Sequence, residues 1–289
     1  MENSTDLNAL RKDSLLESPN GCKAEAPGEN NRGPHGIKNQ FHGVQWWETF
    51  FDLTYAGLDL DSIGIEQTRR EVDFMIDVLD LNKHQGIVDI GSGLGRHVLE
   101  FARRGFKHVT GLDQSPILTE ESRARAELEN LAPRFITGDA RGLPYSGEFE
   151  RAYIWMNLLG YFEDPADDAR ILASAARALK PGGKLLLDII HRDWVIRNFS
   201  SNGWKRVNNE YILEDRTFDL ITSTVYSSWT MITHTGTYHR QMRLRLYSLN
   251  ELIGMFSQSG LRFEDAWANL DKVPATFDAY HLKILAIKE

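Results

Sequence analysis

A glycine-rich loop between an apolar run and a helical pattern constrains this chain most. Residues 88–105 read VDIGSGLGRHVLEFARRG: a carboxylate sits within the apolar run, and three glycines follow it at alternate positions. Such a loop presents bare backbone amides at the N-terminus of a helix, which suits a nucleotide ligand. The pattern therefore predicts a strand, a ligand-binding turn and a helix in immediate succession.

The rest of the chain repeats this alternation of short apolar strands with amphipathic helices. Strands are expected at residues 86–91, 108–113, 134–139, 151–156, 184–190, 261–270 and 280–289. Helix signals separate most of them, such as the Ser115-Pro116 start and the S-x-x-E capping box of Ser248 and Glu251. Mostly apolar strands that alternate with helices predict an α/β fold whose largely parallel sheet is covered on both faces.

Between residues 204 and 247 the alternation stops. This stretch has no clear helical period, and its β-rich runs are separated by turn signals at 219–222 and 235–236. The pattern predicts a three-stranded antiparallel meander inserted between the fifth and sixth strands.

Composition narrows the possible partners and sites. The net charge of −8 argues against a broad nucleic-acid-binding face. The single cysteine, Cys22, excludes an internal disulfide and a multi-cysteine zinc site, and no metal site is expected. The first 14 residues lack the apolar stretch of a signal peptide, and no apolar segment is long enough to span a bilayer. We therefore expect a cytoplasmic protein without a membrane partner.

The letters of the loop separate two kinds of nucleotide. A dinucleotide fingerprint is G-x-G-x-x-G, whereas Gly91, Gly93 and Gly95 form G-x-G-x-G, with Arg96 where the third glycine would stand. Asp89 precedes the loop and would repel a pyrophosphate, but it can accept hydrogen bonds from an amino-acid ammonium group. These features favour S-adenosylmethionine over NAD.

Four motifs in order resemble those of the class I S-adenosylmethionine-dependent methyltransferases. They are VDIGSGLGRH, VTGLDQSP, FITGDARGLPY and ALKPGGKLLLDI, and the resemblance runs from about residue 68 to the C-terminus. Asp113 ends the second strand, 22 residues after Gly91, where a carboxylate can accept from both ribose hydroxyls. The resemblance implies that Asp139 accepts from the adenine amino group and that Ala140 offers its backbone amide to the ring.

The resemblance also implies an organisation of the chain. It predicts a Rossmann-like seven-stranded sheet whose last strand is antiparallel, with a β insertion that roofs the substrate pocket. The expected parts are a disordered tail (1–40), N-terminal helices with the cofactor-binding part (41–190), the roof insertion (191–247), and a helix with the last two strands (248–289). Six aromatic residues fall within 41–55, and among them Tyr55 is a candidate lid residue at the cofactor.

Candidate catalytic residues follow the fourth and fifth strands, because this fold binds substrate beyond the carboxyl ends of its strands. His191 is a candidate general base with Asp193 as its partner, although a structural role at the strand end is the alternative. Tyr161 is a candidate for orienting a substrate hydroxyl, with structural packing as the alternative. Asn157 stands where amino-methylating relatives carry a polar residue, but packing is the role expected for it here. Arg96 is expected to pair with Glu100 or to reach the cofactor carboxylate.

The predicted function is methyl transfer to an oxygen or nitrogen of a small molecule. An anionic acceptor is one option, because residues 191–250 hold eight Lys or Arg and five Asp or Glu, and Gln241, Arg243 and Arg245 share one face of a strand. A solvated face is the alternative for these three. Alternative functions are a non-catalytic S-adenosylmethionine-binding regulator, a tRNA or protein methyltransferase, and an NAD-dependent oxidoreductase. The sequence leaves the acceptor and the oligomeric state open.

Overall fold

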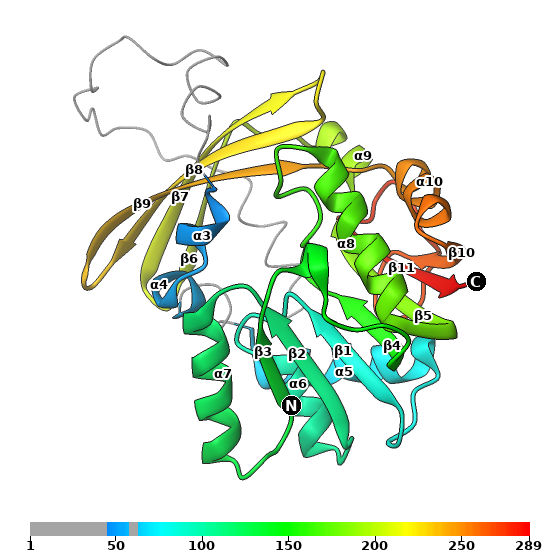
Figure 1. Cartoon of the computed structure of the whole chain (residues 1–289). Coiled ribbons are helices and arrows are strands. Elements are labelled where there is room, and N and C mark those ends of the chain that lie inside the picture. The colour runs from blue at the N-terminus through cyan, green and yellow to red at the C-terminus, as the bar shows by residue number, and fades with distance from the viewer. Residues whose placement is uncertain (1–44, 58–62) are drawn as a thin grey trace, which may run out of the picture.

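A seven-stranded sheet flanked by helices forms the body of the protein (Figure 1). The computed structural model describes residues 45–57 and 63–289; the predicted tail, residues 1–40, lies outside them. The order across the sheet is β10-β11-β5-β4-β1-β2-β3. In chain order its strands are β1 (Gly86–Ile90), β2 (His108–Asp113), β3 (Arg134–Thr137), β4 (Phe149–Ile154), β5 (Leu179–Ile190), β10 (Leu261–Trp267) and β11 (His281–Lys288).

Strand directions confirm the predicted fold class. β1 pairs in parallel with β2 and with β4, and the parallel pairing continues to β3 on one side and β5 on the other. β11 runs antiparallel to both β5 and β10. Four of the five residues of β1 are buried, as expected for a central strand with helices on both faces.

The helices begin and end largely where the sequence signals place them. They are α3 (Trp47–Phe50), α4 (Leu53–Tyr55), α5 (Ile65–Leu79), α6 (Arg96–Arg103), α7 (Pro116–Leu128), α8 (Pro165–Ala178), α9 (Arg192–Arg197) and α10 (Leu249–Gln258), with a short 3-10 helix, η2 (Ala140–Gly142). Ser115 caps α7, and both halves of the capping box at Ser248 and Glu251 are present. α5 begins at Ile65, directly after Gly64 at its N-cap position.

The Pro-Gly-Gly segment differs from its expected role as a turn ahead of the fifth strand. β5 already starts at Leu179, and residues 181–183 lie within it. The pairing with β4 shifts register there, from Phe149↔Leu179 to Arg151↔Lys184. The extra residues therefore form a bulge in β5, which accommodates proline inside a paired strand.

The insertion contains four antiparallel strands, so the predicted three-stranded meander is wrong by one strand. The strands are β6 (Asn202–Val207), β7 (Glu210–Asp219), β8 (Thr224–Thr233) and β9 (Gly236–Arg245). Asn208 and Asn209, with φ of 49° and 68°, form the two-residue turn between β6 and β7. Two left-handed residues suit the tight hairpin turn that asparagine favours, so the Asn-Asn pair was a signal for the additional strand.

Among the described residues, the contacts between the small sheet and the body include the loop after β4 and the helices α3 and α4. Arg245 N donates to the carbonyl oxygen of Gly160 at 2.8 Å, which joins β9 to the loop after β4. A Cβ on Gly160 would lie 2.1 Å from Arg245 O, so only glycine fits this contact. On the other side α3 and α4 lie between the two sheets (Figure 1), and Trp229 of β8 meets the ring of Phe50 at 5.3 Å.

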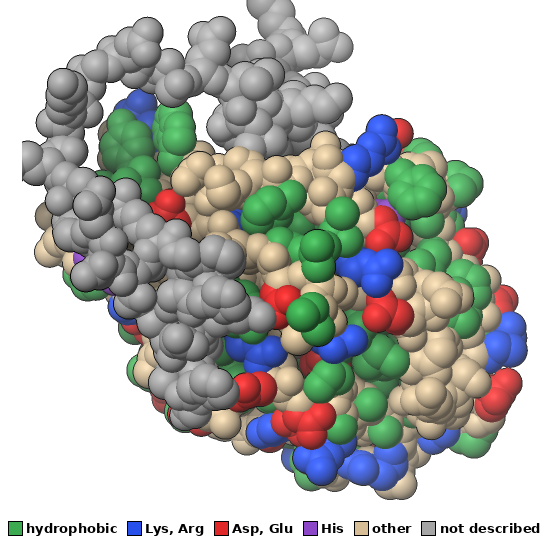
Figure 2. Space-filling model, turned by 90° about the horizontal axis from the view of Figure 1, so that it is seen from above, with side chains coloured by type: hydrophobic (Ala, Val, Ile, Leu, Met, Phe, Trp, Pro, Cys, Tyr) green, Lys and Arg blue, Asp and Glu red, His purple; other side chains and the backbone are tan. Residues whose placement is uncertain are grey.

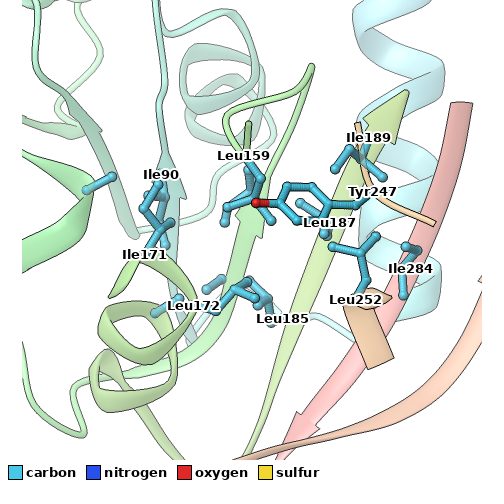
Figure 3. Packing of buried hydrophobic residues seen from close by; sticks show 14 of the residues in the cluster. Ile90, Leu159, Ile171, Leu172, Leu185, Leu187, Ile189, Tyr247, Leu252 and Ile284 are labelled. Carbon is cyan, nitrogen blue, oxygen red and sulfur yellow. The ribbon is translucent and has the colours of Figure 1, made fainter. Parts of the chain in front are cut away.

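Tyr247 is buried among aliphatic side chains in the core beneath this junction. Figure 3 shows Tyr247 among Leu159, Leu187 and Leu252. Its hydroxyl donates to Asp168 Oδ2 of α8 at 2.5 Å, and Asp168 Oδ1 accepts from Gly160 N at 2.9 Å. This carboxylate therefore ties the β4 loop to the segment that leads into α10.

The sequence predicts neither a broad nucleic-acid-binding face nor a membrane-spanning segment. On the face shown in Figure 2, basic side chains alternate with acidic ones, and the described residues form no continuous basic area there. Within residues 45–57 and 63–289, no helix has the length and apolar character needed to cross a membrane.

Candidate functional site

A cavity of about 320 Å³ opens at the carboxyl ends of β1, β2, β3 and β4. It lies at the point where the strand order reverses, since β1 has β2 on one side and β4 on the other. Ligands of open α/β sheets bind at such a switch point. The glycine loop forms one wall, and aromatic residues from α3, α4 and the loop after β4 form a second wall.

The glycine loop follows β1 with left-handed backbones at all three glycines. Gly91 and Gly93, with φ of 84° and 53°, line the cavity. Gly95, with φ of 68°, is not among the lining residues, and a Cβ there would lie 2.6 Å from a ring atom of Phe135. The structure thus gives two of the predicted glycines a place on the cavity and the third a role in helix packing.

Asp89 lies at the base of the cavity and is 2% exposed. Burial raises its pKa from 3.8 to about 7, although Tyr153 and Arg96 partly offset this increase. A buried carboxylate without an ion-pair partner favours its protonated form. A cationic ligand group that entered the cavity would therefore stabilise the ionised form of Asp89.

Asp113 ends β2 and links the glycine loop to the start of α7. Its Oδ2 accepts from Gly93 N at 2.8 Å, and its Oδ1 accepts from Ser115 N at 2.9 Å. Burial raises its pKa, and these amides oppose the shift. The Gln114 amide also donates to this carboxylate, and a carboxylate offers about four acceptor sites, so Asp113 retains acceptor capacity for a hydroxyl.

Asp139 and Ala140 follow β3 and both line the cavity. The Asp139 carboxylate accepts from the Arg141 backbone amide at 2.8 Å and from the Arg141 guanidinium at 2.6 Å. Ala140 opens the 3-10 helix η2, so its backbone amide is a donor without a partner inside that helix. Ala140 is therefore the better prepared of the two for contact with a ligand.

Arg96 pairs with Glu71 of α5, so the predicted pairing with Glu100 is wrong. Glu100 instead binds Arg103 and Arg104. Arg96 also donates to Thr68 Oγ1 at 3.2 Å and still lines the cavity.

Glu71 holds two residues of α6 at once. Its Oε2 accepts from Arg96 and lies 2.8 Å from His97 Nε2. Burial raises the pKa of Glu71, but these two partners outweigh it and lower that pKa to about 2. Burial and Arg96 lower the pKa of His97 to about 4, so its neutral ring donates to the carboxylate at pH 7. The cluster fixes the helix that begins directly after the glycine loop.

The aromatic wall carries two predicted site residues. Tyr161 stacks on Phe51 with ring centroids 5.5 Å apart, and Trp46 meets its edge at 5.0 Å. Tyr55, 8% exposed, also lines the cavity and packs against Phe51 at 5.2 Å. The structure thus brings Tyr55 and Tyr161 to one wall.

His191 is not brought to this site. Its ring is 6% exposed, it is not among the cavity-lining residues, and its Nδ1 lies 3.1 Å from the carbonyl oxygen of Ala279. Its Nε2 is 3.7 Å from Asp193, which Arg192 binds at 2.9 Å. The structural alternative at the end of β5 fits this geometry better than a general base does.

The predicted anion clamp of the insertion does not reach this cavity either. None of Gln241, Arg243 and Arg245 is among the described residues that line it. Arg243 is buried, at 9% exposure, so a fully solvated face is also wrong for it. Arg245 lies 5.0 Å above the ring of Tyr247 and 3.8 Å from Glu251.

The turn after β4 contributes more to the site than the sequence predicts, because the sequence indicates only a packing role for Asn157. Met156 and Asn157 both have left-handed backbones, with φ of 59° and 69°, and both line the cavity. Sparsely populated backbone conformations in non-glycine residues cluster at functional sites. Asn157 stood out in the sequence by its position, but nothing local indicated that it would reach the cavity.

Comparisons with known proteins agree with this geometry. Residues 87–183 match the model of a protein family described as "Methyltransferase domain". The 2-methyl-6-phytyl-1,4-hydroquinone methyltransferase of Spinacia oleracea chloroplasts is 28% identical over 186 residues, which are 63% of this chain and 52% of the relative. The ubiquinone/menaquinone biosynthesis C-methyltransferase UbiE of Ruegeria sp. is 33% identical over 132 residues, 45% of this chain and 51% of the relative. The chain spans about half the length of both curated relatives.

A solved structure shares the fold over most of the chain. The S-adenosylmethionine-dependent methyltransferase from Clostridium acetobutylicum superposes with a TM-score of 0.71 at 15% identity, covering 82% of this chain and 96% of that one. The ordered motifs, the strand order and the family match agree with one another. Residues 87–183 therefore form a methyltransferase domain with the fold of S-adenosylmethionine-dependent methyltransferases, and S-adenosylmethionine is the cofactor that this domain implies.

Proposed function

We propose that this protein transfers a methyl group from S-adenosylmethionine to an oxygen or nitrogen atom of a small, ring-bearing acceptor. One observation carries the proposal: a continuous cavity joins Asp113 and the glycine loop to the aromatic wall of Phe51, Tyr55 and Tyr161. A nucleoside and an apolar acceptor can lie end to end in such a space. Ligand sites of this kind combine apolar walls with a few directed polar groups.

The residues of the first wall fit the cofactor. The remaining acceptor capacity of the Asp113 carboxylate suits a ribose hydroxyl. The Ala140 amide suits a ring nitrogen of adenine, whereas Asp139 can take the adenine amino group only if Arg141 releases it. Ionised Asp89 suits the ammonium group. We propose Asp89, Gly91, Gly93, Asp113, Ala140 and Tyr55 as cofactor contacts.

Catalysis would rest on positioning. The bound cofactor supplies an electrophilic methyl group on a sulfonium, whose departure needs no proton donor. The protein then has to hold the acceptor in line at short distance. Phe51 and Tyr161 stack on each other and give this part of the cavity an aromatic lining. Among the described lining residues the one histidine is His97, and Glu71 engages it. We therefore propose Tyr161 as the residue that orients the acceptor.

A ring carbon of a hydroquinone is the second candidate for the methylated atom. The names of the two curated relatives favour it, because one acts on a hydroquinone and the other is a C-methyltransferase. The aromatic wall suits a flat ring in either case. The cytoplasmic location stays a prediction.

Methyl transfer can be tested without knowledge of the acceptor. The protein is incubated with methyl-labelled S-adenosylmethionine and an extract of small metabolites, and mass spectrometry identifies any labelled product. We expect a labelled ring-bearing molecule, and its loss in the Asp113→Asn variant. Asp164→Asn is the matched control, since Asp164 likewise accepts from the backbone amide two residues later but lies away from the cavity. A protein that binds the cofactor but labels nothing would contradict the proposal and support a regulatory binding role.

A further inference from the structure

The turn after β4 is fixed to β5 by three hydrogen bonds. Met156 N donates to Asp188 Oδ2 at 3.1 Å, and Asn157 N donates to the Asp188 carbonyl oxygen at 3.2 Å. Ile190 N donates to Asn157 Oδ1 at 2.8 Å. These bonds hold two non-glycine residues in left-handed conformations that they would otherwise leave.

The hydrogen bond from Ile190 determines which way the Asn157 amide points. A backbone N–H only donates, so the side-chain atom that faces it must be the carbonyl oxygen. The Nδ2 group is left with two N–H donors, and no described residue accepts from them. Nδ2 is not one of the fully buried side-chain atoms without a partner. It is therefore accessible from the cavity that Asn157 lines.

We infer that Asn157 donates a hydrogen bond to the methyl acceptor, and that the acceptor carries a hydroxyl or carbonyl oxygen beside the reacting atom. The inference rests on the proposed function and narrows its substrate class. Asn157 lies in the turn after β4, which is the neighbour of β1 and β5 in the sheet, and it lines the cavity. An amine that presents N–H groups would find two more donors here, whereas an oxygen finds its complement.

The donor also has a chemical consequence. A hydrogen bond to an ionised phenolic or enolic oxygen favours the charged form, and so promotes loss of the proton without a strong base nearby. An acceptor that lacks the oxygen leaves a buried donor without a partner, which disfavours its binding. Asn157 therefore acts as a specificity-determining residue.

Asp188 is the positioning residue for this donor. It is 2% exposed, and besides Met156 N it binds His281 Nδ1 at 3.0 Å and Lys283 Nζ at 3.2 Å. Burial raises the pKa of Asp188, but His281 and Lys283 outweigh burial and hold that pKa below its usual range. The carboxylate thus stays ionised at neutral pH and continues to accept the hydrogen bond from Met156 N.

Asn157→Asp isolates the donor. Aspartate keeps the size of the side chain, tolerates the left-handed backbone and still accepts from Ile190 N, but it cannot donate to the cavity when ionised. The matched control is Asn130→Asp, an exposed left-handed asparagine away from the cavity. The probes are 1,4-hydroquinone and 1,4-phenylenediamine, each titrated into the full chain saturated with S-adenosylhomocysteine.

Calorimetry and side-chain amide NMR read out the result. We expect hydroquinone to bind the wild type more tightly than the diamine and to shift the amide resonance that disappears in Asn157→Asp. We also expect the variant to lose about tenfold or more in hydroquinone affinity, while its affinity for S-adenosylhomocysteine and the Asn130→Asp control stay unchanged. Equal affinity for the two probes, an unshifted resonance or an unaffected variant overturns the inference. The probe comparison on the wild type needs no variant to fold, and failure to bind S-adenosylhomocysteine would instead overturn the proposed function.

Discussion

Replacing Asp89 with asparagine tests the electrostatics of the cofactor site. The side chain is 2% exposed, and burial raises its pKa from 3.8 to about 7. The folded protein therefore holds a proton that the unfolded chain releases between these two values. A shift of about three pKa units corresponds to about 4 kcal/mol. Above pH 7, where Asp89 is ionised, the free energy of unfolding is lower by this amount.

The sign of the pH dependence follows from the raised pKa. The stability that comes from protonated Asp89 is fully present below pH 3.8 and is lost as the pH rises through 7. The amide of the variant does not titrate, so Asp89→Asn should gain stability relative to the wild type as the pH rises. About 3 kcal/mol of this relative gain should fall between pH 4.5 and pH 8. Any constant cost of the substitution cancels in this comparison.

Urea denaturation of both proteins at the two pH values measures this difference. A change below about 1 kcal/mol would refute the assignment of a buried, unpaired carboxylate. Calorimetry adds a second measurement: the wild type should bind S-adenosylhomocysteine about tenfold more tightly at pH 8 than at pH 6, because ionised Asp89 pairs with the ammonium group. The variant should bind more weakly at pH 8 and show little dependence on pH.

Three further substitutions test the surroundings of the site. His191→Asn should lower methyl transfer by less than about tenfold, since loss of a general base costs about 10²–10⁴-fold; a loss in that range would return His191 to the catalytic site. Gly160→Ala should cost about 3 kcal/mol or more in urea denaturation, against less than about 1 kcal/mol for Gly142→Ala, which has open space; equal costs would contradict the close contact with β9. Tyr247→Phe should lower the free energy of unfolding by about 1–3 kcal/mol, and by more at pH 8 than at pH 5. The reason is that burial raises the pKa of Asp168 to about 6 and the tyrosine hydroxyl stabilises its ionised form. A cost independent of pH would argue against this contact.

Local patterns were enough to predict the large sheet and the cofactor wall. Each strand of that sheet is a short apolar run, and each motif lies at a strand end whose place in a parallel sheet is fixed by connection rules. Asp89 and Asp113 could therefore be assigned from their positions alone, and the structure places both on the cavity. The antiparallel last strand followed from the family resemblance.

Contacts between distant segments could not be read in the same way. The i,i+4 rule favours Glu100 as the partner of Arg96, but Arg69, Arg103 and Arg104 pair with Glu100. Arg96 pairs instead with Glu71, which lies on a helix 25 residues earlier. The orientation of Asn157 depends on a strand 33 residues later. The fourth strand of the insertion was a different kind of error, because the Asn-Asn turn signal was local and was overlooked.

Calorimetry with S-adenosylhomocysteine tests most directly whether Asp113 contacts the ribose. The wild type should bind the ligand, and Asp113→Asn should weaken binding by about tenfold or more, because an amide gives up one acceptor oxygen and the charge. Asp164→Asn should bind like the wild type. No binding by the wild type at millimolar ligand, or equal affinity in the Asp113 variant, would contradict the account.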